Sequence, residues 1–302
     1  MKIGLALPSV LMAERFKERI FAPKDLFFWL ANGLIKKNHQ VYIYSTTNTK
    51  IKKSKLITGL KLLENKDFVS IKDKSKLPAV ADATTFIRNQ YEFEIELVGK
   101  IIADANEKKF DIIHIYLDSI SHYLFRLSNI PVVFTLHDPV FEKDTLEYLR
   151  YKFSSDKNYH YVAISKYQKN VYVNSFGLKS IFTIHHGIPS NKFTFSEISD
   201  KYLSSIGRYI PEKGIDIAIN LAIKFKLPLK IASSNNYLSS PYYLKKIKPY
   251  LNSRYINEIN FLNHKERNIF LKSSKLFLFP IQWEEPFGLV MIESMATGTP
   301  VV

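Results

Sequence analysis

The first part of the chain alternates short apolar, β-branched runs with amphipathic stretches of helical period. This alternation is typical of a parallel sheet whose strands are joined by crossover helices. We therefore expect a doubly wound domain over residues 1–190, with helices at Leu26–Lys37, Tyr91–Ala105 and Lys166–Asn174. Its expected strands are Ile3–Leu7, Val41–Tyr44, Ile112–Ile115, Val132–Leu136, Tyr161–Ile164 and Ile181–Ile184.

The same alternation begins again after a polar stretch, residues 190–201, which we interpret as a linker. It predicts a second α/β domain over residues 191–302, with helices at Gly214–Phe225 and Lys265–Lys272. Its expected strands are Tyr202–Ser205, Leu229–Ala232, Ile259–Phe261 and Leu276–Phe279. Because Thr299–Val302 has the pattern of a strand that is only starting, we expect this second domain to be incomplete and the chain to be a fragment.

The composition fits two globular domains. The 302 residues are 46% hydrophobic, which is enough for two cores, and no apolar run reaches the roughly 18–20 residues that a membrane-spanning helix needs. The absence of cysteine excludes disulfides, thiolate catalysis and cysteine-ligated metal sites. It also fits a reducing compartment, so we expect a cytoplasmic protein.

The chain is strongly basic, with a formal net charge of +15. Such a charge favours anionic partners, for example nucleoside diphosphates or anionic lipid headgroups. The alternative is a lysine-rich composition without functional meaning. In the densest segment, residues 50–76, the lysines are mixed with Glu64, Asp67 and Asp73, which favours an exposed, solvated surface.

The segment Trp283–Val302 has the pattern of a strand end, a loop with proline and glycine, a helix and a tight turn. The spacing of Leu289, Ile292 and Ala296 predicts that these residues face the core and that Glu293 lies on the adjoining helix face.

The start of this expected helix combines free amides with carboxylates. The amides of Gly288, Leu289 and Val290 are placed to bind an anion. The carboxylates of Glu285 and Glu293 could accept hydrogen bonds from sugar hydroxyls. The alternative is that the two acids only favour a helix N-terminus electrostatically.

A second group of polar residues follows the expected strand Tyr202–Ser205 and precedes a helix. Gly207 and Arg208 open this turn, and Lys213 closes it. Turns at the carboxyl edge of a parallel sheet are where such folds bind ligands. The guanidinium of Arg208 and the ammonium of Lys213 would neutralise a departing diphosphate. The alternative is an ordinary surface turn.

Taken together, the Gly207-Arg208 turn with Lys213, the Glu285 to Glu293 segment and the late Gly298-Thr299-Pro300 turn resemble glycosyltransferase family 4. The resemblance implies the GT-B fold, in which two Rossmann-like domains face each other across a cleft. It implies a retaining, metal-independent glycosyltransferase of hexosyltransferase type, without a cofactor and with no metal-binding residues.

The resemblance also implies roles for single residues. Gly207, Arg208 and Lys213 would bind the donor diphosphate together with the amides of Gly288, Leu289 and Val290, and Glu293 would bind the ribose. Glu285 and His137, which follows the expected strand Val132–Leu136, are the catalytic candidates because they would face the transferred sugar.

The implied partners are a nucleoside diphosphate sugar and a glycan or lipid-linked acceptor, with no nucleic acid. Positive charge and family habit favour peripheral association with the inner face of the membrane. Two alternatives stay open: a nucleotide-sugar epimerase of the same fold, and a catalytically silent partner that binds a nucleotide sugar.

The chain departs from the family pattern after its first strand. Many members have a glycine-rich loop there, whereas this chain has Leu7–Ala13. A contact between this loop and the diphosphate is therefore in doubt, and Arg15, Lys17 or Arg19 could compensate for it.

Overall fold

The chain forms two compact units. Unit 1 comprises Met1–Lys17 and Pro23–His185, and unit 2 comprises Glu18–Ala22 and His186–Val302. The main division falls a few residues before the expected boundary at 190/191. The computed structural model describes residues 1–19, 21–68, 81–116, 119–153, 158–200, 202–234, 237–260 and 262–302.

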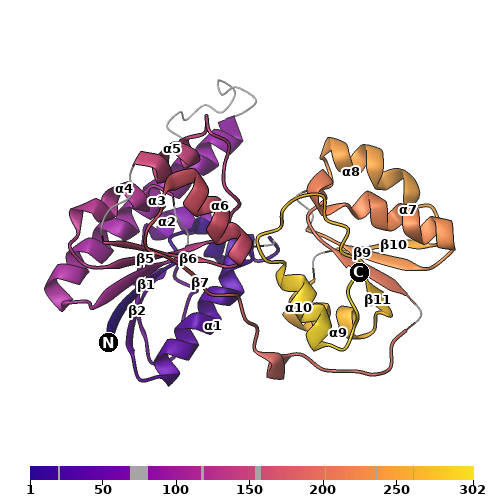
Figure 1. Cartoon of the computed structure of the whole chain (residues 1–302), viewed down its shortest axis with the longest axis horizontal. Coiled ribbons are helices and arrows are strands. Elements are labelled where there is room, and N and C mark those ends of the chain that lie inside the picture. The colour runs from indigo at the N-terminus through magenta and orange to yellow at the C-terminus, as the bar shows by residue number, and fades with distance from the viewer. Residues whose placement is uncertain are drawn as a thin grey trace. The chain divides into compact units, whose positions relative to one another are not determined.

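Unit 1 is built on a parallel sheet with the strand order β3-β2-β1-β4-β5-β6-β7 among the described residues (Figure 1). The strands are β1 (Lys2–Ala6), β2 (Gln40–Ser45), β3 (Lys55–Thr58), β4 (Ile112–Ile115), β5 (Val132–Leu136), β6 (Tyr159–Ala163) and β7 (Ile181–Thr183). The helices are α1 (Pro23–Lys36), α2 (Lys61–Asn65), α3 (Ala81–Lys108), α4 (Ser121–Leu124), α5 (Leu146–Phe153) and α6 (Lys166–Phe176).

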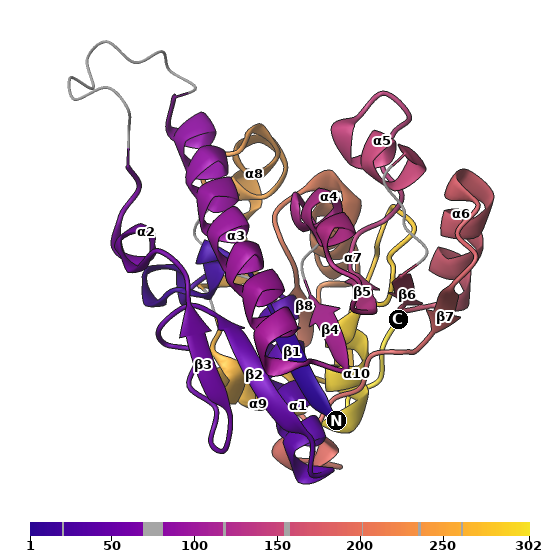
Figure 2. The ribbon, with the colours of Figure 1, turned by 90° about the vertical axis from the view of Figure 1, so that its left-hand side faces the viewer.

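Alternation along the strands decides which residues meet which helices. In β2, Tyr42 and Tyr44 belong to the large core cluster that also contains Phe93 and Leu97 of α3. The long helix α3 accordingly crosses one face of the sheet (Figure 2). Because both faces of a parallel sheet are covered, its strands are apolar on both sides. Side chains that are at most 2% exposed occur at the end of β1 and just after it, at Ala6 and Leu7, and in β2, at Val41 and Ile43.

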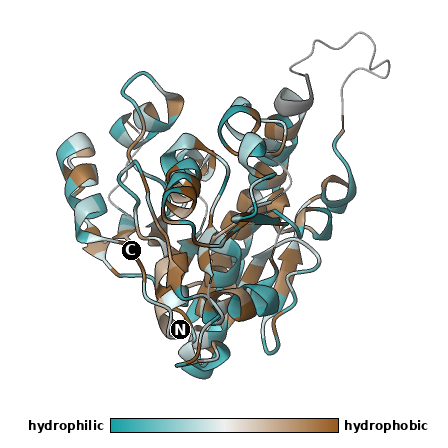
Figure 3. Ribbon diagram, turned by 90° about the vertical axis from the view of Figure 1, so that its right-hand side faces the viewer, coloured by the Kyte–Doolittle hydropathy of each residue, from teal (hydrophilic) through white to brown (hydrophobic). Residues whose placement is uncertain are grey.

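Unit 2 is built on a smaller parallel sheet with the order β10-β9-β8-β11. Its core cluster packs α7 on β9 through Leu229 and Ile231, and a second cluster places Phe277 against α9. Hydrophobic residues concentrate on the strands, and the helices carry both kinds of residue (Figure 3). The strands are β8 (Leu203–Ile206), β9 (Leu229–Ala232), β10 (Ile256–Ile259) and β11 (Leu276–Phe277), and the helices are α7 (Ile215–Phe225), α8 (Pro241–Lys246), α9 (His264–Lys272) and α10 (Leu289–Ala296).

Several elements differ from the sequence prediction, which named no helix at α2, α4, α5 or α8. The strand expected at Ile259–Phe261 is β10, which ends at Ile259; Phe261 itself lies outside the described residues. In the lysine-dense segment 50–76, the described part contains β3 and α2. The prediction missed β3 because it is an edge strand with no fully buried residue, so it lacks a strong apolar pattern.

Each sheet has a point where the strand order reverses. In unit 1 this point lies between β1 and β4, and in unit 2 it lies between β8 and β11. The loops that leave two such strands at their carboxyl ends diverge to opposite faces of the sheet, which opens a crevice where ligands bind in this type of fold. The fold therefore directs attention to the loops after β8 and β11.

Candidate active site

Two loops of unit 2 meet where the strand order reverses. The loop after β8 carries Gly214 with φ of +62°, and a Cβ added there would lie 1.9 Å from the carbonyl oxygen of Pro280 in the loop after β11. Only glycine allows the two backbones to approach so closely. The Gln282 amide also donates to the Glu212 carbonyl at 2.8 Å. The two loops are therefore joined by a backbone hydrogen bond as well as by close packing at Gly214.

An ion pair between Lys213 and Glu285 lies at this junction. Lys213 Nζ is 2.5 Å from Glu285 Oε2, and the two side chains are only 14% and 16% exposed. The aliphatic stem of Lys213 lies against Gly207, where an added Cβ would be 3.4 Å away. The structure thus brings together three of the residues that the sequence singled out.

Trp283 completes this cluster, although its position in the sequence predicted no role for it. Its indole Nε1–H donates to Glu285 Oε2 at 2.6 Å. The ammonium of Lys213 lies 5.2 Å from the centroid of the same indole, within the range of a cation–π interaction. Trp283 therefore contacts both members of the ion pair. The only sequence signal was its position two residues before Glu285.

Arg208 lies in the loop after β8 and is partly buried. Its carbonyl oxygen accepts from the Ile210 amide at 2.8 Å, which tightens the turn. Within the part of the chain that the structure describes, its guanidinium makes no hydrogen bond or ion pair. The five N–H donors of this group remain available for an anion.

Helix α10 begins directly after Gly288, whose φ is +82°. A Cβ added to Gly288 would lie 2.5 Å from Met291 Cε and 3.2 Å from the ring of Phe279, so the helix start is tightly enclosed. The amides of Leu289 and Val290 belong to the first turn and have no acceptor within the helix. The structure thus provides the helix N-terminus that the sequence predicted.

The buried face of α10 differs from the prediction. Leu289, Ile292 and Ala296 are all partly exposed, whereas Glu293 and Ser294 are 4% and 0% exposed. The reason is that polar contacts compensate for burial on this face. Ser294 Oγ donates to the Thr299 carbonyl at 3.0 Å, and the Glu293 carboxylate binds a guanidinium.

That guanidinium belongs to Arg267 of α9. Arg267 Nη2 donates to Glu293 Oε1 at 2.9 Å, and Arg267 Nε lies 2.8 Å from Glu293 Oε2, so the two side chains form a close ion pair. Glu293, expected to bind ribose, is therefore held by Arg267 and not by the Lys213–Glu285 cluster. Arg267 could not be found from the sequence, because a contact between two helices leaves no local pattern.

His137, in unit 1, follows β5 directly. Its ring lies 5.1 Å from that of Tyr116, which comes just after β4. The side chain of Gln168 fixes the backbone on both sides, because its Nε2 donates to the carbonyls of Leu136 and Asp138 at 3.3 and 2.9 Å. The histidine is thus placed at the carboxyl edge of the sheet by a helix that the sequence predicted.

Burial keeps two neighbouring groups uncharged near neutral pH. Loss of hydration lowers the pKa of His114 to about 4 and raises the pKa of Tyr116 to about 12. The His114 ring shares a hydrogen bond of 2.7 Å with Thr135 Oγ1 and lies 5.2 Å from the ring of Tyr116. Tyr116 therefore packs between His114 and His137 as a neutral ring.

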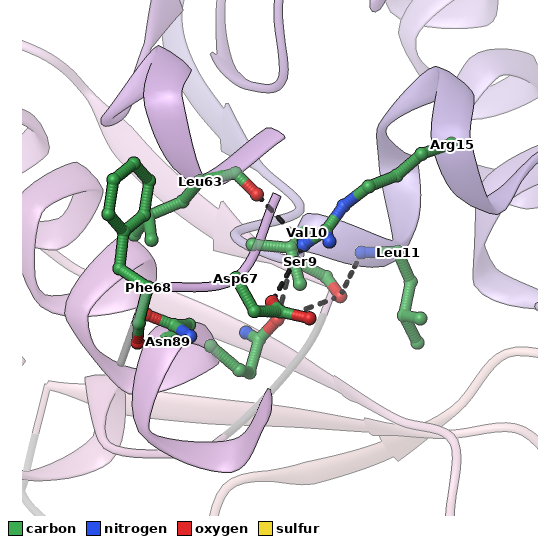
Figure 4. Close-up of polar contacts among 9 residues, drawn as sticks. Ser9, Val10, Leu11, Arg15, Leu63, Asp67, Phe68 and Asn89 are labelled. Carbon is green, nitrogen blue, oxygen red and sulfur yellow. Dashed lines mark hydrogen bonds and ion pairs between the residues drawn. The ribbon is translucent and has the colours of Figure 1, made fainter. Parts of the chain in front are cut away.

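Hydrogen bonds within the loop and to helix α3 close the loop after β1 (Figure 4). Val10 N and Ser9 Oγ donate to Gln90 Oε1 at 2.9 and 3.2 Å, and Leu11 N donates to Ser9 Oγ. In a glycine-rich loop these amides would be open to a phosphate. Here α3 supplies the acceptor, because Gln90 belongs to that helix.

Arg15, one of the residues that could compensate for the missing glycine-rich loop, binds within unit 1. Its Nη2 donates to the Leu63 carbonyl and to Asp67 Oδ1, both at 2.9 Å. Its guanidinium carbon also lies 4.3 Å from the centroid of the Phe16 ring. These contacts hold the Arg15 side chain within unit 1.

The described residues contain neither a candidate metal site nor a candidate membrane-spanning helix. Among them, no group of three or more histidine, aspartate or glutamate side chains is placed to hold a metal ion. No helix in the same part of the chain is both long enough and apolar enough to cross a membrane.

The family follows from comparison with known proteins. Residues 28–192 match the family described as Glycosyltransferase Family 4, and residues 191–302 match the one described as Glycosyl transferases group 1. Since the first match covers more than half of the chain, the protein belongs to glycosyltransferase family 4. The resemblance inferred from the sequence is confirmed.

Curated relatives match over part of their length. An uncharacterized 42.6 kDa protein in the cps region of Klebsiella pneumoniae is 29% identical over 47% of this chain and 37% of its own. An uncharacterized glycosyltransferase of Methanocaldococcus jannaschii is 25% identical over 68% of this chain and 58% of its own. The chain thus spans less than two thirds of the length of these two relatives.

Solved structures confirm the GT-B fold. HepE of Anabaena in complex with UDP-glucose superposes with a TM-score of 0.66 and 14% identity, over 100% of this chain and 79% of HepE. Sucrose-phosphate synthase of Thermosynechococcus elongatus gives a TM-score of 0.72 and 16% identity, over 100% and 80% of the two chains. At these identities the likeness concerns the fold.

Proposed function

We propose that this protein is a retaining, metal-independent glycosyltransferase of hexosyltransferase type, which transfers a sugar from a nucleoside diphosphate to an acceptor hydroxyl. The observation that carries the proposal is the Lys213–Glu285 pair, 2.5 Å long, at the point where the strand order of unit 2 reverses. The Lys213 ammonium and the Glu285 carboxylate lie there, close in sequence to the start of α10. The chain also belongs to a family of glycosyltransferases, which supports sugar transfer as the reaction.

A nucleoside diphosphate sugar is the proposed donor, and no further cofactor is needed. HepE, which shares the fold, is described in complex with UDP-glucose. In this chain Arg208 and Lys213 would bind the diphosphate together with Gly207 and the amides of Gly288, Leu289 and Val290, and Glu293 would accept the ribose hydroxyls. Lys213 would exchange its carboxylate partner for a phosphate, which keeps the ammonium paired throughout.

The proposed reaction needs charge stabilisation more than a nucleophile. The bond between the sugar anomeric carbon and the phosphate oxygen breaks, the bond to the acceptor oxygen forms on the same face, and the leaving phosphate takes the acceptor proton. Arg208 and Lys213 would neutralise the growing negative charge of the diphosphate. Glu285 and His137 would orient the transferred sugar.

The acceptor is proposed to be a glycan or a lipid-linked hydroxyl compound, and the protein to act in the cytoplasm. The net charge of +15 supports contact with anionic lipids at the inner face of the membrane. Such peripheral binding would weaken as salt is added, because the attraction is screened beyond about 10 Å at 0.1 M salt.

The test combines donor selection with product analysis. Uridine, guanosine and adenosine diphosphate sugars are first screened by thermal shift, and the stabilising donor is then incubated with and without acceptor. We expect an acceptor-dependent product whose anomeric configuration, read by proton NMR, equals that of the donor. A changed donor formed without acceptor would instead identify an epimerase, and unchanged turnover in Lys213→Ala or Glu285→Ala would contradict the proposed site.

A further inference from the structure

Two hydrogen-bond donors converge on one oxygen of the Glu285 carboxylate. Lys213 Nζ donates to Oε2 at 2.5 Å, and the Trp283 indole Nε1–H donates to the same oxygen at 2.6 Å. All three side chains are partly buried. Among the residues that the structure describes, none donates a hydrogen bond to the other oxygen, Oε1.

The two donors differ in what they can do. The Lys213 ammonium has three donors on a flexible stem, so it can turn from a carboxylate to a phosphate. The Trp283 indole has a single N–H, fixed in the plane of its ring, and it can only donate. Its face lies 5.2 Å from the Lys213 ammonium, while its N–H points at Glu285. If Lys213 moves to a diphosphate, the indole N–H remains as the donor to Oε2.

We infer that Trp283 is a positioning residue, which keeps Glu285 in place when Lys213 turns to the donor diphosphate. The inference rests on the proposed function, in which Glu285 orients the transferred sugar. With Oε2 held by the indole, the carboxylate presents Oε1 to a sugar hydroxyl. Without this hydrogen bond the side chain would rotate among several conformers, and orienting the sugar would cost conformational entropy.

The backbone of the loop after β11 fixes Trp283 relative to Glu285. The Glu285 amide donates to the Trp283 carbonyl at 3.0 Å, which folds the two residues into a tight turn. Just before this turn, the Gln282 amide donates to the Glu212 carbonyl at 2.8 Å, and Gln282 Nε2 donates to the Pro280 carbonyl at 3.0 Å. The indole therefore stands on a defined backbone, two residues before the carboxylate that it contacts.

A purely structural role predicts a different result from a positioning role. If Trp283 only packs the loop, its replacement would displace the adjoining Lys213 and weaken binding of every nucleotide to a similar extent. If Trp283 positions Glu285 for the sugar, its replacement would weaken only the ligands that carry the sugar. The decisive comparison is therefore between a nucleoside diphosphate sugar and the free nucleoside diphosphate.

The experiment measures both affinities by isothermal titration calorimetry in the wild type and in Trp283→Phe, which keeps an aromatic ring but has no N–H. The probes are UDP-glucose, GDP-mannose or ADP-glucose, whichever stabilises the wild type, and the free diphosphate of the same nucleoside. We expect Trp283→Phe to bind the sugar nucleotide about fivefold or more weakly, because Glu285 loses a charged hydrogen bond. The free nucleoside diphosphate should bind within about twofold of the wild type.

Trp29→Phe is the matched control, because it makes the same substitution at the other tryptophan of the chain, in α1 of unit 1. It should keep both affinities. A 3-benzothienylalanine at position 283 has sulfur in place of the indole N–H at nearly the same shape, so it should repeat the effect even if Trp283→Phe does not fold.

Undiminished binding of the sugar nucleotide in a folded Trp283 variant would overturn the inference, as would equal losses for both ligands. A wild type that binds none of UDP, GDP and ADP would instead refute the proposed function itself.

Discussion

At the scale of single residues, the site depends on positions where only one side chain fits. Gly214 is left-handed and faces the Pro280 carbonyl, so it is constrained both by its φ and by its surroundings. Gly177, which ends α6, has a similar φ of +68° but no atom within 4 Å of an added Cβ. A substitution at Gly177 therefore tests only the free-energy cost of the left-handed backbone. A substitution at Gly214 adds the cost of a steric clash with Pro280.

Alanine at these two positions should give different losses of stability. Gly177→Ala should cost about 1–2 kcal/mol, because an L-residue in the left-handed region pays only the conformational term. Gly214→Ala should cost more and should also weaken nucleotide binding, since the loops after β8 and β11 must separate. Thermal melting and nucleotide titration of both variants check this. Equal losses of stability with intact binding would contradict the role of Gly214.

A partly buried histidine, His114, should make stability depend on pH. The folded state holds the pKa of His114 at about 4, well below its usual 6.5. Between these values the unfolded state binds a proton that the folded state does not, so stability falls as pH falls from about 6.5 to about 4. His114→Gln should reduce this acid sensitivity, as measured by melting temperature against pH. An identical pH profile in wild type and variant would show that His114 does not contribute.

At the scale of elements, alternating apolar and helical patterns predicted most strands and helices of both units. Which residues are buried, however, also depends on tertiary packing, which the sequence patterns do not show. The prediction placed the wrong residues of α10 in the core, because Arg267 and Thr299 compensate for the burial of Glu293 and Ser294. Lys213 and Glu285 could be selected as site candidates from the sequence, because they lie in the loops after β8 and β11 and the fold brings these loops together. Trp283 and Arg267 depend on tertiary contacts that the sequence does not display.

The loop after β1 lacks the glycine-rich sequence of many family members, and helix α3 contacts it instead. Gln90 of α3 occupies the loop amides, and Arg15 is bound to Asp67 and Leu63. We therefore expect Arg15→Met to leave nucleoside diphosphate affinity within about twofold of the wild type, since the ion pair is local to unit 1. Calorimetric titration measures this. A loss of affinity of about tenfold or more would assign Arg15 to the diphosphate site instead.

At the scale of the whole molecule, the two units repeat one architectural principle. Each has a parallel sheet with a reversal of strand order, and each places candidate residues in loops at the carboxyl edge of its sheet. The charge of +15 is spread over the chain and says little about any one position. Lys213 is the cation on which the proposed donor site depends most. The fold of unit 2 pairs it with Glu285 where the strand order of the sheet reverses.

The most direct test is the affinity of the preferred nucleoside diphosphate for Lys213→Met, measured by isothermal titration calorimetry. Lys245→Met, which removes an exposed charge from α8, is the control. We expect Lys213→Met to weaken binding by about tenfold or more, because a charged hydrogen bond to phosphate is lost, and Lys245→Met to bind like the wild type. Binding of wild-type strength in a folded Lys213→Met protein would contradict the assignment of the donor site.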